Sequence, residues 1–397
     1  MSQAPLRVAV AGAGAFGKNH LRVYRELEVA SLGVALVAAV EPDAARAADA
    51  EAKYAIPVFA TVDELLAADL HLDAASVSVP TVHHHAVASA LLDAGLDLLV
   101  EKPLAASLAE ADDLIARAAK NQRILQPGHL ERFNPAALAI QPQLRRPMFF
   151  EAHRLSIFTP RALDVDVVLD LMIHDLDIVL TFAASPVREV RAVGLPILSP
   201  KVDIANVRAE FESGCVANFT ASRVSTERVR KLRFFEPRQY VSIDYARQDL
   251  LIIKMEESAG KSSPAELIAS LPPQVASLLP PGIAEGIATG KIDLAKIDPA
   301  LIAQFAAMAK IDPALIAQLT SPKESKRGLS FAKPPVTPGE PLRLEILSFL
   351  ESVRTRREPQ VTARQGREAL ALALEIQASM AAHAKRAGLE NFFKPGA

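Results

Sequence analysis

The chain has 397 residues, half of them hydrophobic, and a formal net charge of −2 at pH 7. A chain of this length is longer than one that usually folds around a single hydrophobic core, so we predict two domains. The near-neutral charge offers no basic footprint for nucleic acid, and the single cysteine, Cys215, excludes an internal disulfide framework. We find neither a signal-peptide pattern nor an apolar run long enough to cross a membrane, so we expect a cytoplasmic protein with no membrane partner.

A glycine-rich turn opens the chain. The apolar run 8–11 reads as a buried strand and leads into Gly12-Ala-Gly14-Ala-Phe-Gly17, the G-x-G-x-x-G spacing. Gly12 allows a tight turn, Gly14 allows a pyrophosphate to approach the backbone, and Gly17 allows the next helix to pack on the strand. The helix N-terminus would offer free N–H groups to the phosphates. We expect cofactor contacts from Gly12, Gly14, Ala15, Phe16 and Gly17.

An acidic residue follows the second predicted strand. Residues 34–40 form an apolar run, and Glu41 lies directly after it. A carboxylate there accepts hydrogen bonds from ribose hydroxyls and repels a 2′-phosphate. No cation lies closer than Arg46 along the chain. These features predict NAD as the cofactor rather than NADP, although a solvated strand-end glutamate is the alternative.

Strands and helices then alternate up to residue 127. We expect helices at 16–28, 44–54, 86–94 and 108–121, another that begins at 61, and strands at 57–59, 74–79, 96–100 and 124–126. Gly95 is suited to a helix C-cap and Ser107 to an N-cap. The alternation predicts an α/β fold with a parallel, doubly wound Rossmann sheet whose ligands lie at the carboxyl ends of the strands.

Several polar segments fall on that sheet edge. Lys102 lies in Glu101-Lys102-Pro103, where the proline restricts it to an extended conformation. Its ammonium could bind a substrate hydroxyl and stabilise developing negative charge, or it could form a surface ion pair with Glu101. The three consecutive histidines 83–85 point in different directions, which favours one cofactor contact over a metal cluster. Further cofactor contacts are expected from Val79, Pro80, Thr81, His84 and Glu101.

The pattern changes from residue 128 onward. We expect strands at 149–156, 189–193, 206–211, 215–223, 229–235, 240–244 and 250–253, and helices at 167–182, 342–357 and 363–385. This predicts an α/β domain with an open, mostly antiparallel sheet that could pair face to face in an oligomer. The segment 255–332 interrupts it with a repeat, Ala-Lys-Ile-Asp-Pro-Ala-Leu-Ile-Ala-Gln, at 295–304 and 309–318.

We therefore divide the chain into a Rossmann domain (1–127), a substrate-binding and oligomerisation domain (128–254 and 333–397) and an insertion (255–332). Each Asp-Pro pair of the repeat suits the start of a short helix. The insertion could be a lid, a partner-docking arm or a loop.

Asp170 and His174 are four residues apart in a helical pattern, which places both on one face. A near-neutral imidazole can take a hydroxyl proton as a hydride leaves, and a carboxylate one turn away can orient it. A surface pair is the alternative. A metal site would need a third ligand. We see none at a matching spacing and expect no metal.

Substrate recognition has candidates beside the first domain boundary. Arg154 and Arg161 could pair with an anionic substrate, because guanidinium suits phosphate and carboxylate, or they could form surface salt bridges. The segment 128–135 crowds polar groups where the chain leaves the Rossmann domain. The expected substrate contacts are Lys102, Arg132, Phe133, Asn134, Arg154, Arg161, Asp170 and His174.

The chain resembles the Gfo/Idh/MocA oxidoreductase family in four motifs. They are the glycine motif, Pro80-Thr81-Val-His-His84, Glu101-Lys102-Pro103 and Asp170-x-x-x-His174. The resemblance covers about 5–253 and 340–385. It implies an NAD-dependent dehydrogenase acting on a CH–OH group, with Lys102, Asp170 and His174 as the catalytic group. It also implies a homo-oligomer, a dimer or tetramer, formed through the C-terminal sheet.

A narrower resemblance rests on Gly128-His-Leu-Glu-Arg-Phe-Asn-Pro135 and on the segment 234–245. Both are similar to UDP-N-acetylglucosamine 3-dehydrogenases of 2,3-diamino-sugar lipid A synthesis. This implies oxidation of the 3-hydroxyl of a UDP-sugar and a partner aminotransferase that takes the 3-keto product. An inositol or other polyol dehydrogenase of the same family is the alternative enzyme, and a non-catalytic NAD-binding scaffold or sensor is the alternative outside enzymes.

Overall fold

The computed structural model describes residues 4–159, 165–257 and 327–389, so both copies of the repeat lie outside the described residues. Contacts divide the chain into two units. The first comprises residues 1–237, 241–251 and 333–397, and the second comprises residues 238–240 and 252–332. All the described residues predicted to act in catalysis or binding belong to the first unit.

A parallel sheet forms the N-terminal half of the first unit. Its strands are β1 (Leu6–Ala11), β2 (Val34–Val40), β3 (Val58–Phe59), β4 (Ala74–Val77), β5 (Asp97–Glu101) and β6 (Leu125–Gly128). Their order is β3-β2-β1-β4-β5-β6, and every neighbouring pair is parallel. The predicted Rossmann sheet is thus confirmed.

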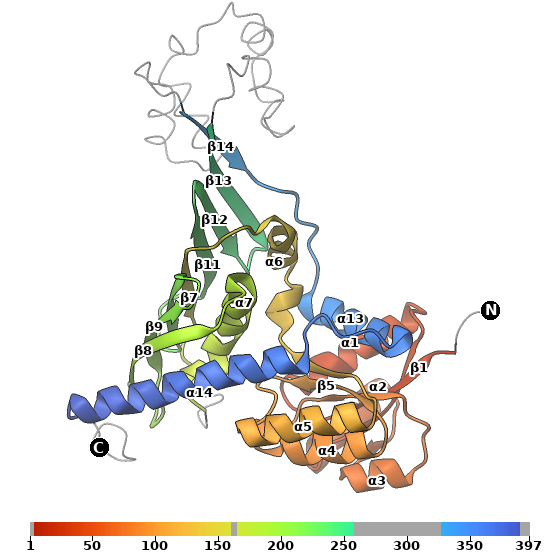
Figure 1. Ribbon diagram of the computed structural model, residues 1–397. Coiled ribbons are helices and arrows are strands. Elements are labelled where there is room, and N and C mark those ends of the chain that lie inside the picture. Colours follow the sequence, from red (N-terminus) through yellow and green to blue (C-terminus); the bar gives the residue numbers. More distant parts are fainter. Residues whose placement is uncertain (1–3, 160–164, 258–326, 390–397) are drawn as a thin grey trace, which may run out of the picture. The chain divides into compact units, whose positions relative to one another are not determined.

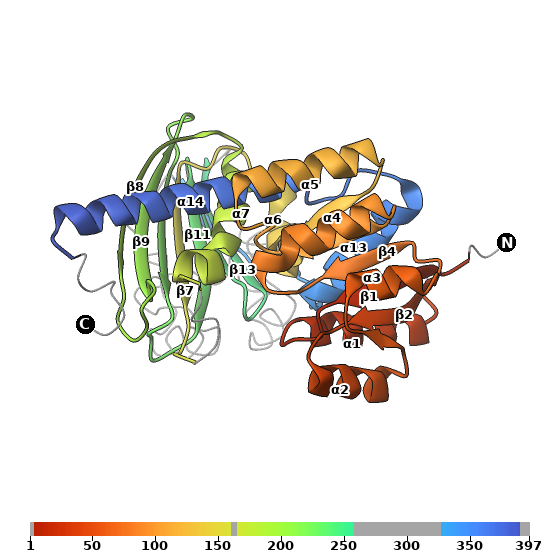
Figure 2. The ribbon, with the colours of Figure 1, turned by 90° about the horizontal axis from the view of Figure 1, so that it is seen from below.

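Helices cover both faces of this sheet (Figure 2). They are α1 (Gly17–Val29), α2 (Ala44–Tyr54), α3 (Val62–Ala67), α4 (His84–Asp93) and α5 (Leu108–Lys120). Alternate residues of β1 belong to two hydrophobic cores: Val8 shares one with Leu21 of α1, and Ala9 shares the other with Leu91 of α4. The predicted cap at Ser107 is confirmed, since its side chain accepts from the Glu110 N–H at 3.3 Å.

The glycine turn has the close packing that its sequence predicts. Gly12 has a φ of +95°, and a Cβ there would lie 2.8 Å from the Ser78 carbonyl oxygen. A Cβ on Gly17 would lie 1.9 Å from the Gly12 carbonyl oxygen. A Cβ on Gly14, in contrast, would meet nothing within 4 Å. Gly12 and Gly17 therefore serve packing, and Gly14 leaves the backbone open to a ligand.

A second sheet follows, and the strands that lie wholly in the first unit have the order β11-β7-β10-β9-β8. They are β7 (Phe149–Leu155), β8 (Val187–Leu195), β9 (Ile204–Phe211), β10 (Val216–Ser222) and β11 (Val229–Glu236). The next two strands, β12 (Gln239–Asp244) and β13 (Asp249–Glu257), have residues in both units. β7 and β10 pair in parallel, whereas β7–β11, β9–β10 and β8–β9 are antiparallel. This confirms the predicted, mostly antiparallel sheet.

The second unit contains a hairpin at the boundary of the predicted insertion. Within it, β13 pairs with β14 (Arg327–Ala332) in antiparallel register, from Ile252 opposite Ala332 to Glu257 opposite Arg327. Residues 255–257 and 327–332, which we placed in the insertion, are therefore strand residues.

The remaining helices connect the two sheets of the first unit. A 3₁₀ turn (η2, Leu130–Phe133) and α6 (Pro135–Ile140) follow β6, and a π-helical segment (η4, Val168–Met172) precedes α7 (Ile173–Ala183). Near the C-terminus, α13 (Pro341–Thr355) packs in the Rossmann core through Ile346 and Phe349. The long α14 (Ala363–Arg386) packs against both β8 and α5 (Figures 1 and 2).

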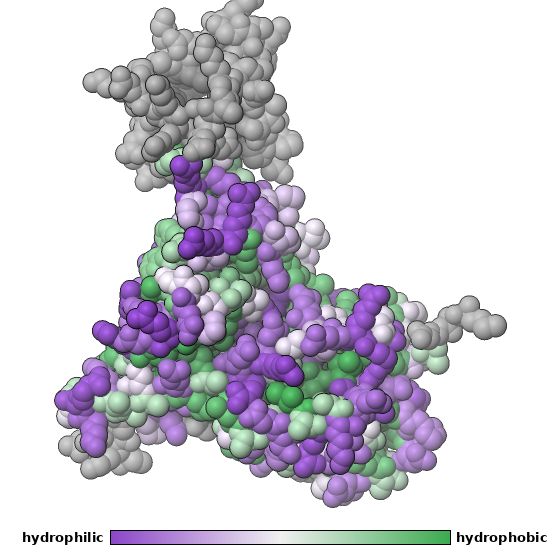
Figure 3. Space-filling model, in the orientation of Figure 1, coloured by the Kyte–Doolittle hydropathy of each residue, from purple (hydrophilic) through white to green (hydrophobic). Residues whose placement is uncertain are grey.

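No helix in the described part of the chain is long and apolar enough to cross a membrane. The face of the first unit seen in Figure 3 mixes hydrophilic and hydrophobic residues.

Candidate functional site

Lys102 lies where two strands of the Rossmann sheet end. Its ammonium donates to the carbonyl oxygen of Asp170 at 2.8 Å and to that of Leu169 at 3.4 Å, and lies 4.0 Å from the Asp170 carboxylate. An ammonium has three N–H donors. Two are directed at carbonyls, which leaves one for a substrate hydroxyl. The Lys102–Pro103 peptide bond is cis.

The two carbonyls come from a widened helical turn. We expected one regular helix over 167–182, but residues Val168–Met172 are π-helical. The Asp166 side chain caps this turn, because it accepts from the N–H groups of Val168 at 2.9 Å and Leu169 at 3.1 Å. Such insertions in helices are frequent at functional sites.

Electrostatics keep His174 neutral at physiological pH. Burial lowers its pKa well below the ordinary value, and the neighbouring cations Lys102 and Arg154 lower it further. Burial also lowers the pKa of Lys102, although Asp170 and Glu101 act to raise it. The structure therefore brings Lys102, Asp170 and His174 together, with an imidazole free to accept a proton. Their catalytic roles remain predictions.

Glu41 lies beside the glycine turn, as predicted. Its carboxylate accepts from the Ala13 N–H at 2.9 Å, the Asp43 N–H at 3.0 Å and the Arg46 guanidinium at 2.9 Å. Burial acts to raise its pKa, but these partners lower it, so the carboxylate is ionised. Glu41 thus fixes the turn that receives the cofactor, and its contact with the ribose remains a prediction.

The predicted cofactor contacts fall into two groups. Ala15 and Phe16 are exposed, Pro80 follows β4, and Thr81 begins a 3₁₀ turn (η1, Thr81–His83). His84 is instead buried, with Nε2 2.9 Å from the Val79 carbonyl oxygen and Nδ1 2.8 Å from that of Pro103.

Glu101 also faces inward. Its carboxylate lies 2.9 Å from His20 Nε2 and accepts from the Lys102 N–H at 3.3 Å. That His84 and Glu101 contact the cofactor remains a prediction. Each holds the backbone beside Lys102.

The expected substrate contact of Arg154 is also revised. Its guanidinium is buried and donates to both oxygens of Asp175 at 2.7 and 3.0 Å and to Glu131 at 3.0 Å. A cation enclosed by two carboxylates is not available to a diphosphate. Arg161 lies outside the described residues.

The other candidates near the domain boundary are buried as well. Arg132 donates to Gln365 at 2.9 Å and lies 3.3 Å from the Asp177 carboxylate. Asn134 caps α6 and donates to the Tyr245 carbonyl oxygen at 3.0 Å, and Phe133 is core. The polar crowding in 128–135 therefore builds the domain junction rather than a substrate surface.

An arginine that we did not predict is better placed. Arg230 is exposed and lies directly opposite Arg154 across β11 and β7. It is also one of the cations near His174. The sequence did contain a signal for Arg230. The alternation along β11 places Val229 and Lys231 on one face and Arg230 on the other.

Glu345 of α13 is a buried carboxyl group beside this region. It is 0% exposed, and neither of its oxygens has a hydrogen-bond partner among the described residues. Burial raises its pKa well above the ordinary value, and the neighbouring Glu101 and Asp177 raise it further. Glu345 therefore keeps its proton to a higher pH than an ordinary glutamate.

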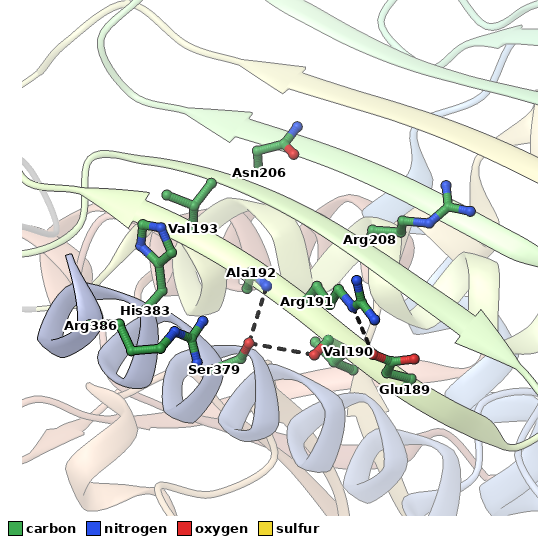
Figure 4. A pocket seen from close by; sticks show the side chains of 10 residues that line it. All are labelled: Glu189, Val190, Arg191, Ala192, Val193, Asn206, Arg208, Ser379, His383 and Arg386. Atoms are coloured by element: carbon green, nitrogen blue, oxygen red, sulfur yellow. Dashed lines mark hydrogen bonds and ion pairs between the residues drawn. The ribbon is translucent and has the colours of Figure 1, made fainter.

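A separate cavity of about 620 Å³ lies between β8, β9 and α14 (Figure 4). Its lining includes Arg191, Arg208, Ser379, His383 and Arg386, none of which belongs to the Lys102 site. Ser379 bridges two backbone groups of β8: its hydroxyl accepts from the Ala192 N–H at 3.1 Å and donates to the Val190 carbonyl oxygen at 3.5 Å.

Comparison with known families agrees with this architecture. The sequence model of the Gfo/Idh/MocA oxidoreductase family, with its NAD-binding Rossmann fold, matches residues 6–129. The model of that family's C-terminal domain matches residues 139–238.

Individual relatives narrow the comparison. UDP-N-acetylglucosamine 3-dehydrogenase of Acidithiobacillus ferrooxidans is 38% identical over 62% of this chain and 76% of its own length. A solved structure of that enzyme covers 96% of this chain and 99% of its own at a TM-score of 0.73 and 30% identity. Inositol 2-dehydrogenase 1 of Saccharopolyspora erythraea is 31% identical over 44% of this chain and 53% of its own length.

The state of Glu345 predicts a pH dependence of stability. Its folded-state pKa is raised, so the stabilisation from the protonated form is complete below the unfolded pKa and is lost as pH rises toward the folded pKa. Glu345→Gln removes this loss. Between pH 5 and 8 we expect the free energy of unfolding of Glu345→Gln, relative to the unmodified protein, to rise by up to about 1.4 kcal/mol per pH unit.

Urea unfolding at several pH values measures this difference. The exposed Glu351→Gln on the same helix is the control and should show no such trend. A difference that stays constant with pH would show that Glu345 is ionised in the folded protein.

Proposed function

The chain belongs to the Gfo/Idh/MocA family of oxidoreductases, and we propose that it oxidises the 3-hydroxyl of UDP-N-acetylglucosamine with NAD. The observation that supports this most directly is the grouping of Lys102, Asp170 and His174 at the carboxyl edge of the Rossmann sheet. Similarity to the Acidithiobacillus enzyme supports the choice of sugar.

The residues of the first unit fit the cofactor. Gly14 is open to a pyrophosphate, and the N-terminus of α1 follows it. Glu41 places an ionised carboxylate beside the same turn, where a ribose hydroxyl can donate to it and a 2′-phosphate is repelled. NAD, when bound, supplies the hydride acceptor.

The chain's own residues handle the hydroxyl group. Lys102 has one N–H donor left for the hydroxyl oxygen and stabilises negative charge that develops there. Neutral His174 takes the hydroxyl proton as general base. The Asp170 carboxylate, 4.0 Å from the ammonium, maintains the positive charge of Lys102.

The 3-keto product of this reaction has the chemistry that an aminotransferase requires. We infer such an enzyme as the functional partner. The inference fails if the 3-keto sugar is not consumed by an aminotransferase supplied with an amino donor.

We expect NADH to form when the protein is mixed with NAD and UDP-N-acetylglucosamine, measured by absorbance of the reduced nicotinamide. Lys102→Met should lower kcat by roughly 10² to 10⁴, because it removes both the hydroxyl contact and the positive charge. The exposed Lys120→Met is the matched control. If the protein oxidises inositol and does not oxidise the UDP-sugar, it is instead a polyol dehydrogenase.

Arg230 is proposed to bind the diphosphate in place of the buried Arg154. Arg230→Gln should raise KM for UDP-N-acetylglucosamine roughly tenfold or more, because a charge-assisted hydrogen bond is lost, and leave kcat nearly unchanged. Steady-state kinetics measure both values, with the exposed Arg228→Gln as control. An unchanged KM for Arg230→Gln would remove this residue from the site.

We also propose that the sheet of the C-terminal domain forms a two-fold dimer. Glu189 and Glu210 lie directly opposite each other on β8 and β9, and so do Arg191 and Arg208. Like charges in direct opposition are unfavourable, and within the chain each arginine is paired along its own strand, Arg191 with Glu189 at 2.7 Å and Arg208 with Glu210 at 3.5 Å. In a symmetric pair, however, the arginine row of one copy can face the glutamate row of the other.

The double variant Arg191→Glu, Arg208→Glu should therefore be monomeric at concentrations where the unmodified protein is dimeric. Sedimentation velocity measures the masses, and Arg188→Glu, at an exposed position of β8, is the control. A double variant with the mass of the unmodified protein would place the interface elsewhere.

A further inference from the structure

Asp166 lies directly before the π-helical turn η4, and both its side chain and its backbone bind that turn. Its Oδ1 accepts from the N–H groups of Val168 at 2.9 Å and Leu169 at 3.1 Å. Its backbone carbonyl oxygen accepts from the Asp170 N–H at 3.1 Å. A capping side chain needs only one acceptor oxygen for these bonds, so the second carboxylate oxygen is left for another partner.

That second oxygen binds the long C-terminal helix. Gln377 of α14 donates from its Nε2 to Asp166 Oδ2. The same helix packs against η4, against β8 and against α5 of the Rossmann domain. One carboxylate therefore joins the turn to a helix that contacts both halves of the first unit.

The backbone on either side of Asp166 is fixed as well. The Val167 N–H donates to the Val202 carbonyl oxygen at 3.0 Å. The Arg223 guanidinium donates to the carbonyl oxygens of Val165 and Val202. These contacts fix where the turn begins, whereas the Asp166 side chain fixes the first N–H groups inside the turn.

The carbonyl groups of this turn hold the lysine. Lys102 Nζ donates to the carbonyl oxygen of Asp170 at 2.8 Å and to that of Leu169 at 3.4 Å. The peptide group between Leu169 and Asp170 is planar and rigid. Its N–H bond to Asp166 and its carbonyl bond to Lys102 are therefore oriented together. A short chain of hydrogen bonds thus runs from Gln377 through Asp166 and the turn to the ammonium.

We propose that Asp166 is a positioning residue for Lys102: it holds the two carbonyls of η4 where they bind the ammonium, and Gln377 ties that position to α14. An ammonium has three N–H donors, so the two that are engaged set the direction of the third. The inference rests on the proposed function, in which this third donor contacts the substrate hydroxyl. Asp166 acts on that contact through Lys102.

The first test needs no turnover. Carbonyl acceptors stabilise the charged ammonium, so their displacement in Asp166→Ala makes Lys102 lose its proton at a lower pH. The variant leaves in place the titratable and charged groups that surround Lys102, which are Glu101, His129, Arg154, Asp170 and His174. Modification by acetic anhydride over a pH series, read by peptide mass spectrometry, gives the midpoint for Lys102. We expect it to fall by about one pH unit.

Two further variants separate positioning from a loss of folding. Asp166→Asn keeps an acceptor oxygen for the turn, so it should restore most of the shift. Exposed Thr61→Ala removes a matched cap, that of α3, whose Oγ1 accepts from the Glu64 N–H at 3.2 Å. It should lower the stability of the protein and leave the Lys102 midpoint unchanged. An unshifted midpoint in folded Asp166→Ala, or a shift of the same size in Thr61→Ala, would overturn the proposal.

Kinetics test the same role in the working enzyme. With a sugar that the unmodified protein oxidises, Asp166→Ala should lower kcat about tenfold or more, because the lysine is misdirected. The KM of the sugar and the dissociation constant of NAD should change less than twofold. In a Lys102→Met background, Asp166→Ala should lower kcat no further, since the group through which it acts is gone.

A merely structural role would lower kcat by the same factor with and without the lysine, and this result would overturn the proposal. If the unmodified protein oxidises no sugar, the proposed function fails. The pH series on Lys102 still decides, in that case, whether Asp166 positions the ammonium.

Discussion

The position of the Lys102 ammonium depends on two segments that lie far apart in the sequence. Glu101 and His84 hold the backbone on either side of the lysine, and the carbonyl groups of Leu169 and Asp170 hold its Nζ. The second contact lies in the π-helical turn that precedes α7, where each carbonyl oxygen has a second lone pair for the ammonium. The Rossmann domain and the C-terminal domain are therefore joined at the residue that would contact the substrate.

The fold was largely predictable because its signals are local. Buried parallel strands appear as continuous apolar runs, and the glycine spacing marks the turn between β1 and α1. The bounds predicted for β2 and α2 agree with the structure. The π-helical turn was not predicted, since the apolar spacing of 167–182 is also compatible with a regular helix. The packing of α13 in the Rossmann core depends on contacts across more than 300 residues, which no local pattern reports.

Some residues of the candidate site could be predicted from the sequence, namely those that their type and their position at the sheet edge identify. Lys102, Asp170 and His174 come together as expected. Arg154 was predicted to pair with an anionic substrate because guanidinium suits phosphate and carboxylate, and Arg132 was predicted to contact substrate because it lies where the chain leaves the Rossmann domain. The carboxylates that bury Arg154 lie 21 and 23 residues away, and their pairing exists only after β7, η2 and α7 have packed.

These buried ion pairs bear on orientation more than on stability. Burying a charge costs free energy that its partner restores only when the geometry is good, so such pairs add little net stability. The bidentate contact of Arg154 with Asp175 and its contact with Glu131 fix α7 against β7 and η2. His174 directly precedes Asp175, and His129 directly precedes η2. The same ion pairs that enclose Arg154 therefore constrain the segments that carry both histidines.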